Sequence, residues 1–127
     1  MNQITEKAET LTRYILNKKH TRPGDNSIRY NLFLPNTNGD TSVFRISGIS
    51  EKEVWEIGVK QVAETQDKSL YGRGDILDSN VLANRLTIET IGNHPRHANI
   101  TGWPKEKPEQ RLIAMELARD AKLYLND

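Results

Sequence analysis

The sequence predicts one α+β domain over residues 1–127, in which a small, mainly antiparallel sheet is packed by two or three helices. Two patterns support this class. Short segments alternate apolar and polar residues, as half-buried strands do, and apolar residues at helical spacing lie between and after them. The third observation is length, because a chain of 127 residues builds one hydrophobic core but not two. No repeat or long linker divides the chain, so we expect a single domain.

The strands are expected in the middle of the chain. Residues 27–34 and 41–47 each alternate apolar and polar side chains, and Asn38-Gly39 between them is typical of a tight reversal. These two segments are therefore predicted to pair as an antiparallel hairpin. Residues 86–91 alternate in the same way and are predicted to form a third strand.

Two helices are predicted from their start signals. Ser50-Glu51-Lys52-Glu53 matches the capping box, in which the Ser50 hydroxyl accepts from the Glu53 amide, and it predicts a helix from 51 to about 65. Gly58 lies within this helix, and we attribute it to the close approach of a neighbouring backbone. Pro108 suits a first helical position and predicts a final helix to about Tyr124.

Three segments are harder to assign. The opening segment has apolar residues at helical spacing, whereas residues 11–16 fit a strand equally well; a helix ending near Asn17 is favoured. Residues 70–75 contain Gly-Arg-Gly-Asp and are predicted to form a turn, because their glycine spacing matches no nucleotide-binding loop. Residues 92–107 are rich in glycine and proline and are predicted to be irregular.

Composition excludes several classes of protein. The chain has no cysteine, which rules out disulfides, cysteine zinc sites and cysteine nucleophiles, and favours a reducing compartment. The first residues lack the apolar core of a signal peptide, and no stretch approaches the roughly 18 apolar residues of a membrane span. We therefore expect a cytoplasmic protein without membrane contact. The net charge of +1 disfavours wholesale coating of nucleic acid.

A basic run near the start gives one alternative function. Arg13, Lys18, Lys19 and Arg22 lie close to Tyr14, so they can contact a phosphate backbone while the tyrosine stacks on a base. The favoured interpretation is a solvated helix end, where cations interact well with the negative end of the helix dipole. Nucleic-acid binding is thus possible but not favoured.

The segment 94–103 is the best candidate for a ligand site. Arg96, His97, Asn99 and Trp103 precede the predicted final helix, whose free N-terminal amides suit an anion such as phosphate. Arg96 can add a bidentate contact, and His97 can exchange protons near neutral pH. The favoured alternative is structural: the polar side chains satisfy the loop's own backbone, and Trp103 docks the loop on the core.

No metal, cofactor or catalytic set is expected. His94 and His97 have the spacing of a helical ligand pair, but Pro95 between them makes a helix improbable there. The sequence has no Gly-x-Ser-x-Gly motif, and no serine has a histidine partner by motif. The sequence therefore leaves open whether the protein is an enzyme.

Three blocks resemble a group of small bacterial proteins of unknown function. They are residues 42–46 leading into 53–58, residues 72–76, and Arg-His-Ala-Asn-Ile-Thr-Gly-Trp-Pro at 96–104. The resemblance implies a stand-alone bacterial protein and carries no activity with it. We expect a non-catalytic binding or accessory protein of a bacterial cytoplasm, with another protein as its partner. The alternatives are a phosphorylated-ligand site in the segment 94–103, as binder or enzyme, and weak nucleic-acid binding by the basic run.

Overall fold

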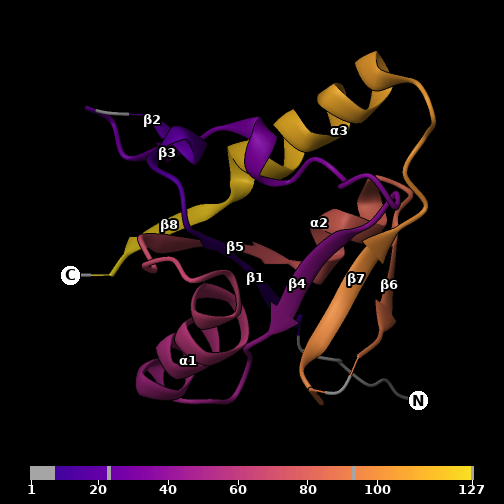
Figure 1. The fold of residues 1–127 in the computed structure, drawn as a ribbon. Coiled ribbons are helices and arrows are strands. Elements are labelled where there is room, and N and C mark those ends of the chain that lie inside the picture. Colours follow the sequence, from indigo (N-terminus) through magenta and orange to yellow (C-terminus); the bar gives the residue numbers. More distant parts are fainter. Residues whose placement is uncertain (1–7, 23, 93, 127) are drawn as a thin grey trace.

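The computed structural model describes residues 8–22, 24–92 and 94–126, and its main feature is a six-stranded sheet (Figure 1). In spatial order the strands are β6 (Thr87–Thr90), β7 (His97–Thr101), β4 (Thr41–Arg45), β1 (Thr10–Ile15), β5 (Gly72–Leu77) and β8 (Lys122–Leu125). Every neighbouring pair in this sheet is antiparallel. The predicted α+β class with a mainly antiparallel sheet is confirmed. A separate two-stranded ladder joins β2 (Thr21–Arg22) to β3 (Ser27–Ile28).

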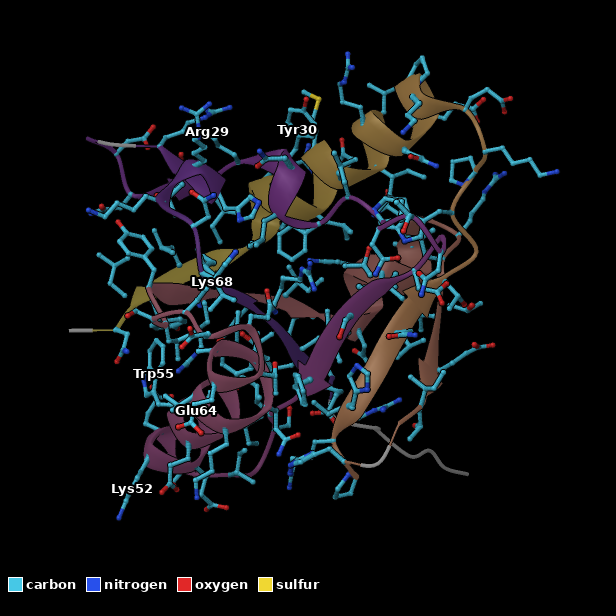
Figure 2. The ribbon with its side chains drawn as sticks, in the orientation of Figure 1. Arg29, Tyr30, Lys52, Trp55, Glu64 and Lys68 are labelled. Carbon is cyan, nitrogen blue, oxygen red and sulfur yellow. The ribbon has the colours of Figure 1, made fainter. Side chains whose placement is uncertain are left out.

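Helical segments cover both faces of the sheet. One face carries α1 (Glu51–Ile57), which continues through a π-helical turn, Gly58–Ala63, and a 3-10 turn, Glu64–Gln66. The other carries α2 (Asp78–Ala83), α3 (Lys107–Asp120) and a 3-10 turn, Tyr30–Leu32. Figure 2 shows Tyr30 on the α3 side of the molecule, and Trp55 and Glu64 on the α1 side. The sheet therefore separates a larger apolar core beneath α3 from a smaller one beneath α1.

The first described strand, β1, corrects the helix that we favoured for the opening segment. Leu11 and Ile15 enter the larger core, while Tyr14 enters the smaller one and donates a hydrogen bond to the Val54 carbonyl. A central strand buries both faces, so its apolar residues satisfy a period of two as well as the helical spacing. Residues 1–7, which supplied part of the helical pattern, lie outside the described residues.

The predicted hairpin of residues 27–34 with 41–47 is wrong. Only Ser27–Ile28 forms a strand, and the chain then forms the 3-10 turn that brings Leu32 and Phe33 into the larger core. β4 pairs instead with β1 and β7. The reversal at Gly39 is present, with a φ of 91°. Alternation in 27–34 therefore arose from packing under α3 and not from strand pairing.

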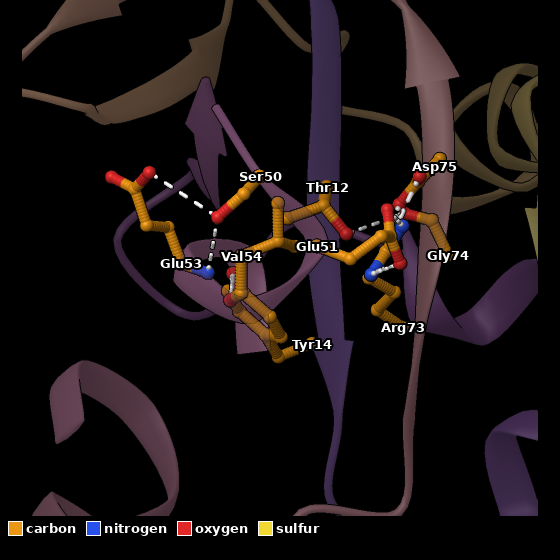
Figure 3. A network of polar contacts seen from close by, with 9 residues as sticks. All are labelled: Thr12, Tyr14, Ser50, Glu51, Glu53, Val54, Arg73, Gly74 and Asp75. Carbon is orange, nitrogen blue, oxygen red and sulfur yellow. Dashed lines mark hydrogen bonds and ion pairs between the residues drawn. The ribbon is translucent and has the colours of Figure 1, made fainter. Parts of the chain in front are cut away.

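The Gly-Arg-Gly-Asp segment is a strand, β5, and not the predicted turn. A Cβ on Gly74 would lie 2.8 Å from Ile28 Cδ1 and 2.9 Å from Leu32 Cδ2, so a larger residue would force these side chains to shift. Arg73 and Asp75 point to the opposite face, towards α1 (Figure 3). The glycines therefore let elements pack against the strand and do not reverse the chain.

The helix predicted from residue 51 is confirmed at its start. The Ser50 hydroxyl accepts from the Glu53 amide at 3.2 Å, and the Glu53 carboxylate accepts from the same hydroxyl at 3.2 Å. The expected reason for Gly58 needs correction, because its neighbour is a side chain. A Cβ on Gly58 would lie 2.5 Å from a ring carbon of Tyr14.

Two further predictions about the second half of the chain are wrong. The final helix ends at Asp120, and β8 follows it along β5, so residues to Tyr124 are not helical. Residues 92–107 include β7, in which Ala98 and Ile100 alternate into the larger core. No helix among the described residues is long and apolar enough to cross a bilayer.

Candidate functional site

His97 is the first residue of β7 and Arg96 precedes it, whereas α3 begins beyond the other end of that strand (Figure 1). The expected site at the N-terminus of the final helix is therefore not assembled around them. The Arg96 guanidinium donates to the carbonyls of Arg45 at 3.2 Å and Ser47 at 3.4 Å. Arg96 thus fastens the start of β7 to the end of β4, which is a structural role.

The other two predicted ligand residues also make internal contacts. Asn99 donates from its side-chain amide to the Asp40 carboxylate at 3.4 Å. Trp103 is half-buried and packs against the larger core. Its indole nitrogen is buried without a hydrogen-bond partner among the described residues. Neither side chain is brought together with His97 around a shared cavity.

The basic run does not form one surface. Lys18 and Lys19 are exposed on a 3-10 turn, Lys18–His20, and Arg22 is exposed in β2. Arg13 instead points inward, so it cannot contact the same phosphate backbone as these three side chains.

His94 and His97 contribute to a cleft between the sheet and the helical layer of α1. Its volume is about 480 Å³, which is within the range of small-molecule sites. The helical layer supplies Gln61, Val62 and Gln66, and the strands supply charged, hydroxyl and ring side chains. The lining residues are Arg13, Tyr14, Asn36, Ser42, Phe44, Gln61, Val62, Gln66, His94 and His97. None of them is acidic.

Arg13 supplies the permanent charge of this cleft. β1 and β4 pair at only two positions, Leu11 with Arg45 and Thr12 with Phe44. Beyond them the Arg13 guanidinium donates to the Ser42 carbonyl at 2.9 Å and the Leu32 carbonyl at 3.1 Å. Burial lowers the pKa of Arg13, but a guanidinium stays protonated in proteins. No carboxylate of the described residues forms an ion pair with it.

The tautomer of His94 follows from its contacts. The Arg96 amide donates to His94 Nδ1 at 3.1 Å, so this nitrogen is an acceptor and the neutral ring carries its proton on Nε2. The ring meets Phe44 edge-on, with centroids 5.6 Å apart and planes at 78°. His94 therefore has an Nε2–H donor, and the residue lines the cleft.

Ser42 and His97 form a polar pair in the same cleft. Ser42 Oγ lies 2.7 Å from His97 Nε2, although 55 residues separate them in the chain. The imidazole packs against Phe44, with ring centroids 5.1 Å apart. On its other nitrogen it lies close to Gly92, where a Cβ would be only 2.7 Å from Nδ1. The ring is thus held with Nε2 towards the serine.

The sequence did not reveal this pair. Ser42 is one polar residue of a strand whose neighbours in the sheet were unknown, and His97 was placed in an irregular segment. Alternation at Ala98 and Ile100 was the available signal, because it puts His97 and Asn99 on the face opposite the larger core. Only the pairing of β4 with β7 then identifies the partner.

A second polar cluster surrounds Arg73 (Figure 3). The buried guanidinium donates to Asp75 and Glu51 and packs against the rings of Trp55 and Tyr124. Its charge is paired with two carboxylates of the fold, so we assign it to stability. The described residues contain no group of three or more histidine and carboxylate side chains placed to hold a metal ion.

No family model, curated protein or solved structure matches the chain. The resemblance to small bacterial proteins stays a prediction, and a functional conclusion rests on the cleft itself.

Proposed function

We propose that the protein binds a small phosphorylated ligand in the cleft between the sheet and the α1 layer. The observation that carries this proposal is Arg13: a largely buried cation without a carboxylate partner among the described residues, in a cleft whose lining has no acid. A desolvated charge is costly unless an opposite charge approaches it. A bound phosphoryl group would offset that cost.

The neutral donors around Arg13 also suit phosphate. His94 contributes its Nε2 proton, and the side-chain amides of Asn36, Gln61 and Gln66 line the same space. A phosphoryl group has several strong acceptor oxygens, so it can use more than one of these donors together. This site keeps the expected ligand class and His97 from the sequence, but it replaces Arg96, Asn99 and Trp103 with Arg13 and His94.

Binding can be measured with inorganic phosphate as the probe. The imidazole signals of His94 and His97 are followed by NMR during a phosphate titration, with sodium chloride holding the ionic strength constant. We expect saturable shifts at both rings, because both line the cleft. Arg13→Met should abolish these saturable shifts. Because Arg13 also donates hydrogen bonds to two backbone carbonyls, a second variant is needed that keeps Arg13.

Gln66→Glu is that variant. It adds a negative charge at the exposed wall of the cleft and should weaken phosphate binding by about tenfold or more. Ser79→Asp makes the same change of charge on α2, outside the cleft, and should leave binding unaltered. The proposal would be contradicted if sodium chloride alone gave equal NMR shifts of the two imidazoles. It would also be contradicted if Gln66→Glu and Ser79→Asp bound phosphate with equal affinity.

Other expectations about function stay predictions. A protein partner would be recovered in stoichiometric amount when the protein is purified from its native host. Nucleic-acid binding by Lys18, Lys19 and Arg22 would weaken steeply with added salt. The bacterial cytoplasm as the location is a prediction of the same kind.

A further inference from the structure

The cleft contains a nucleophile next to a base. Ser42 Oγ and His97 Nε2 are 2.7 Å apart, which is within the range of a nucleophile hydrogen-bonded to its general base. Both residues line the cleft. In the tautomer that serves catalysis, the Ser42 hydroxyl donates to an unprotonated Nε2.

We propose that Ser42 is an acyl-accepting nucleophile and His97 its general base, and that the pair hydrolyses small carboxylic esters. This inference goes beyond ligand binding and does not depend on it. The pair is a dyad, because no described residue donates or accepts a hydrogen bond at His97 Nδ1. Packing against Phe44 and the close approach of Gly92 orient the ring in place of a carboxylate.

The first step transfers the acyl group to the serine. Ser42 Oγ attacks the ester carbonyl carbon, and the hydroxyl proton passes to His97 Nε2. The tetrahedral intermediate carries a negative oxygen, for which Arg13 and the Nε2 proton of His94 are the donors that line the cleft. The bond from carbon to the alcohol oxygen then breaks, and His97 returns the proton to the leaving alkoxide.

The second step restores the enzyme. A water molecule attacks the acyl carbon while His97 takes one of its protons. The bond from carbon to Ser42 Oγ then breaks, the serine recovers its proton from His97, and a carboxylic acid is released. Atoms and charge balance over the two steps with water as the only co-reactant.

A covalent probe tests the nucleophile without a known substrate. The full chain is treated with a biotin-tagged fluorophosphonate, digested, and analysed by mass spectrometry for labelled peptides. We expect label on Ser42 and on no other serine, and no label on the chain in concentrated urea. His97→Gln should slow labelling, and the release of p-nitrophenol from p-nitrophenyl acetate, by about 100-fold.

Matched variants separate this inference from its alternatives. Ser42→Ala should lose both activities, whereas Ser79→Ala, on the exposed surface of α2, should keep them. Thermal unfolding of each variant checks that it folds, and the comparison of native with urea-treated protein needs no variant. Absence of label, label spread over several serines, or an unchanged rate in His97→Gln would overturn the inference. If the protein binds phosphate but Ser42 is not labelled, the assignment of Ser42 as a nucleophile is contradicted and the proposed function is not. If Ser42 is labelled but phosphate does not bind, only the proposed function is contradicted.

Discussion

The guanidinium of Arg73 on β5 forms two parallel hydrogen bonds with the carboxylate of Glu51, the first residue of α1. The Nη1–Oε1 distance is 3.1 Å and the Nη2–Oε2 distance is 3.0 Å (Figure 3). Arg73 is only 2% exposed, and the ring centroids of Trp55 and Tyr124 lie 4.8 and 4.5 Å from its central carbon. One side chain therefore joins β5, α1 and β8.

Arg73→Met should lower the free energy of unfolding by about 3 kcal/mol, because it leaves the largely buried Asp75 carboxylate without its ion-pair partner. Urea denaturation measures this change. Glu51→Gln is the control: the Glu51 side chain is 71% exposed, so we expect a loss of about 1 kcal/mol or less. Equal losses in the two variants would show that the exposed ion pair, and not burial of Arg73, stabilises this junction.

Gly58→Ala should destabilise the protein, although alanine normally favours a helix by about 1 kcal/mol over glycine. The new Cβ would lie 2.5 Å from a Tyr14 ring carbon, and the Tyr14 ring is packed against Phe44 and hydrogen-bonded to Val54. Overpacking of this kind costs about 1–3 kcal/mol. Thermal unfolding provides the measurement, with Lys52→Ala on the exposed face of α1 as the neutral control. A gain in stability for Gly58→Ala would mean that Tyr14 moves freely.

Stability should depend on pH through His20. Burial, followed by the charge of Arg13, lowers the pKa of His20 in the folded chain. The unfolded chain, with a pKa near the usual value of about 6.5, then binds the proton more readily. Above the unfolded pKa, His20 therefore does not lower the free energy of unfolding. Below it, the free energy of unfolding falls as the pH decreases towards the folded pKa. Urea denaturation between neutral and mildly acidic pH should show a smaller decline in His20→Gln, and parallel curves would refute the assignment.

Trp103→Ala should lower the free energy of unfolding by about 3 kcal/mol, as truncations of large packed side chains do. Trp103→Phe should cost less, because it keeps a packed ring and removes the buried indole N–H that lacks a partner among the described residues. Neither variant should change phosphate affinity, since Trp103 does not line the cleft. A loss of affinity at unchanged stability would instead make Trp103 part of a ligand surface.

Much of the local structure was readable from the chain. Ser50 and Glu53 define a helix start by contacts within four residues, and the absence of cysteine excludes its chemistry without reference to any fold. The α+β class followed from alternating and helical apolar patterns. The helix start and the α+β class were confirmed because they depend on interactions between neighbours in sequence.

The elements that were predicted wrongly depend on distant partners. β1 is a strand because it lies between β4 and β5, and Gly74 suits a strand because Ile28 and Leu32 pack over it. Local periodicity does not distinguish these outcomes from a helix or a turn.

The sequence by itself determined a cysteine-free α+β chain with a capped helix at Ser50, and it predicted His97 as one candidate ligand residue. Only the tertiary structure decided that His97 faces Ser42, and that Arg13 is a cation of a cleft and not of a solvated surface. The physical reason is sheet topology. The order β7-β4-β1 brings three side chains from distant parts of the sequence into one cleft, and no local pattern encodes which strands become neighbours.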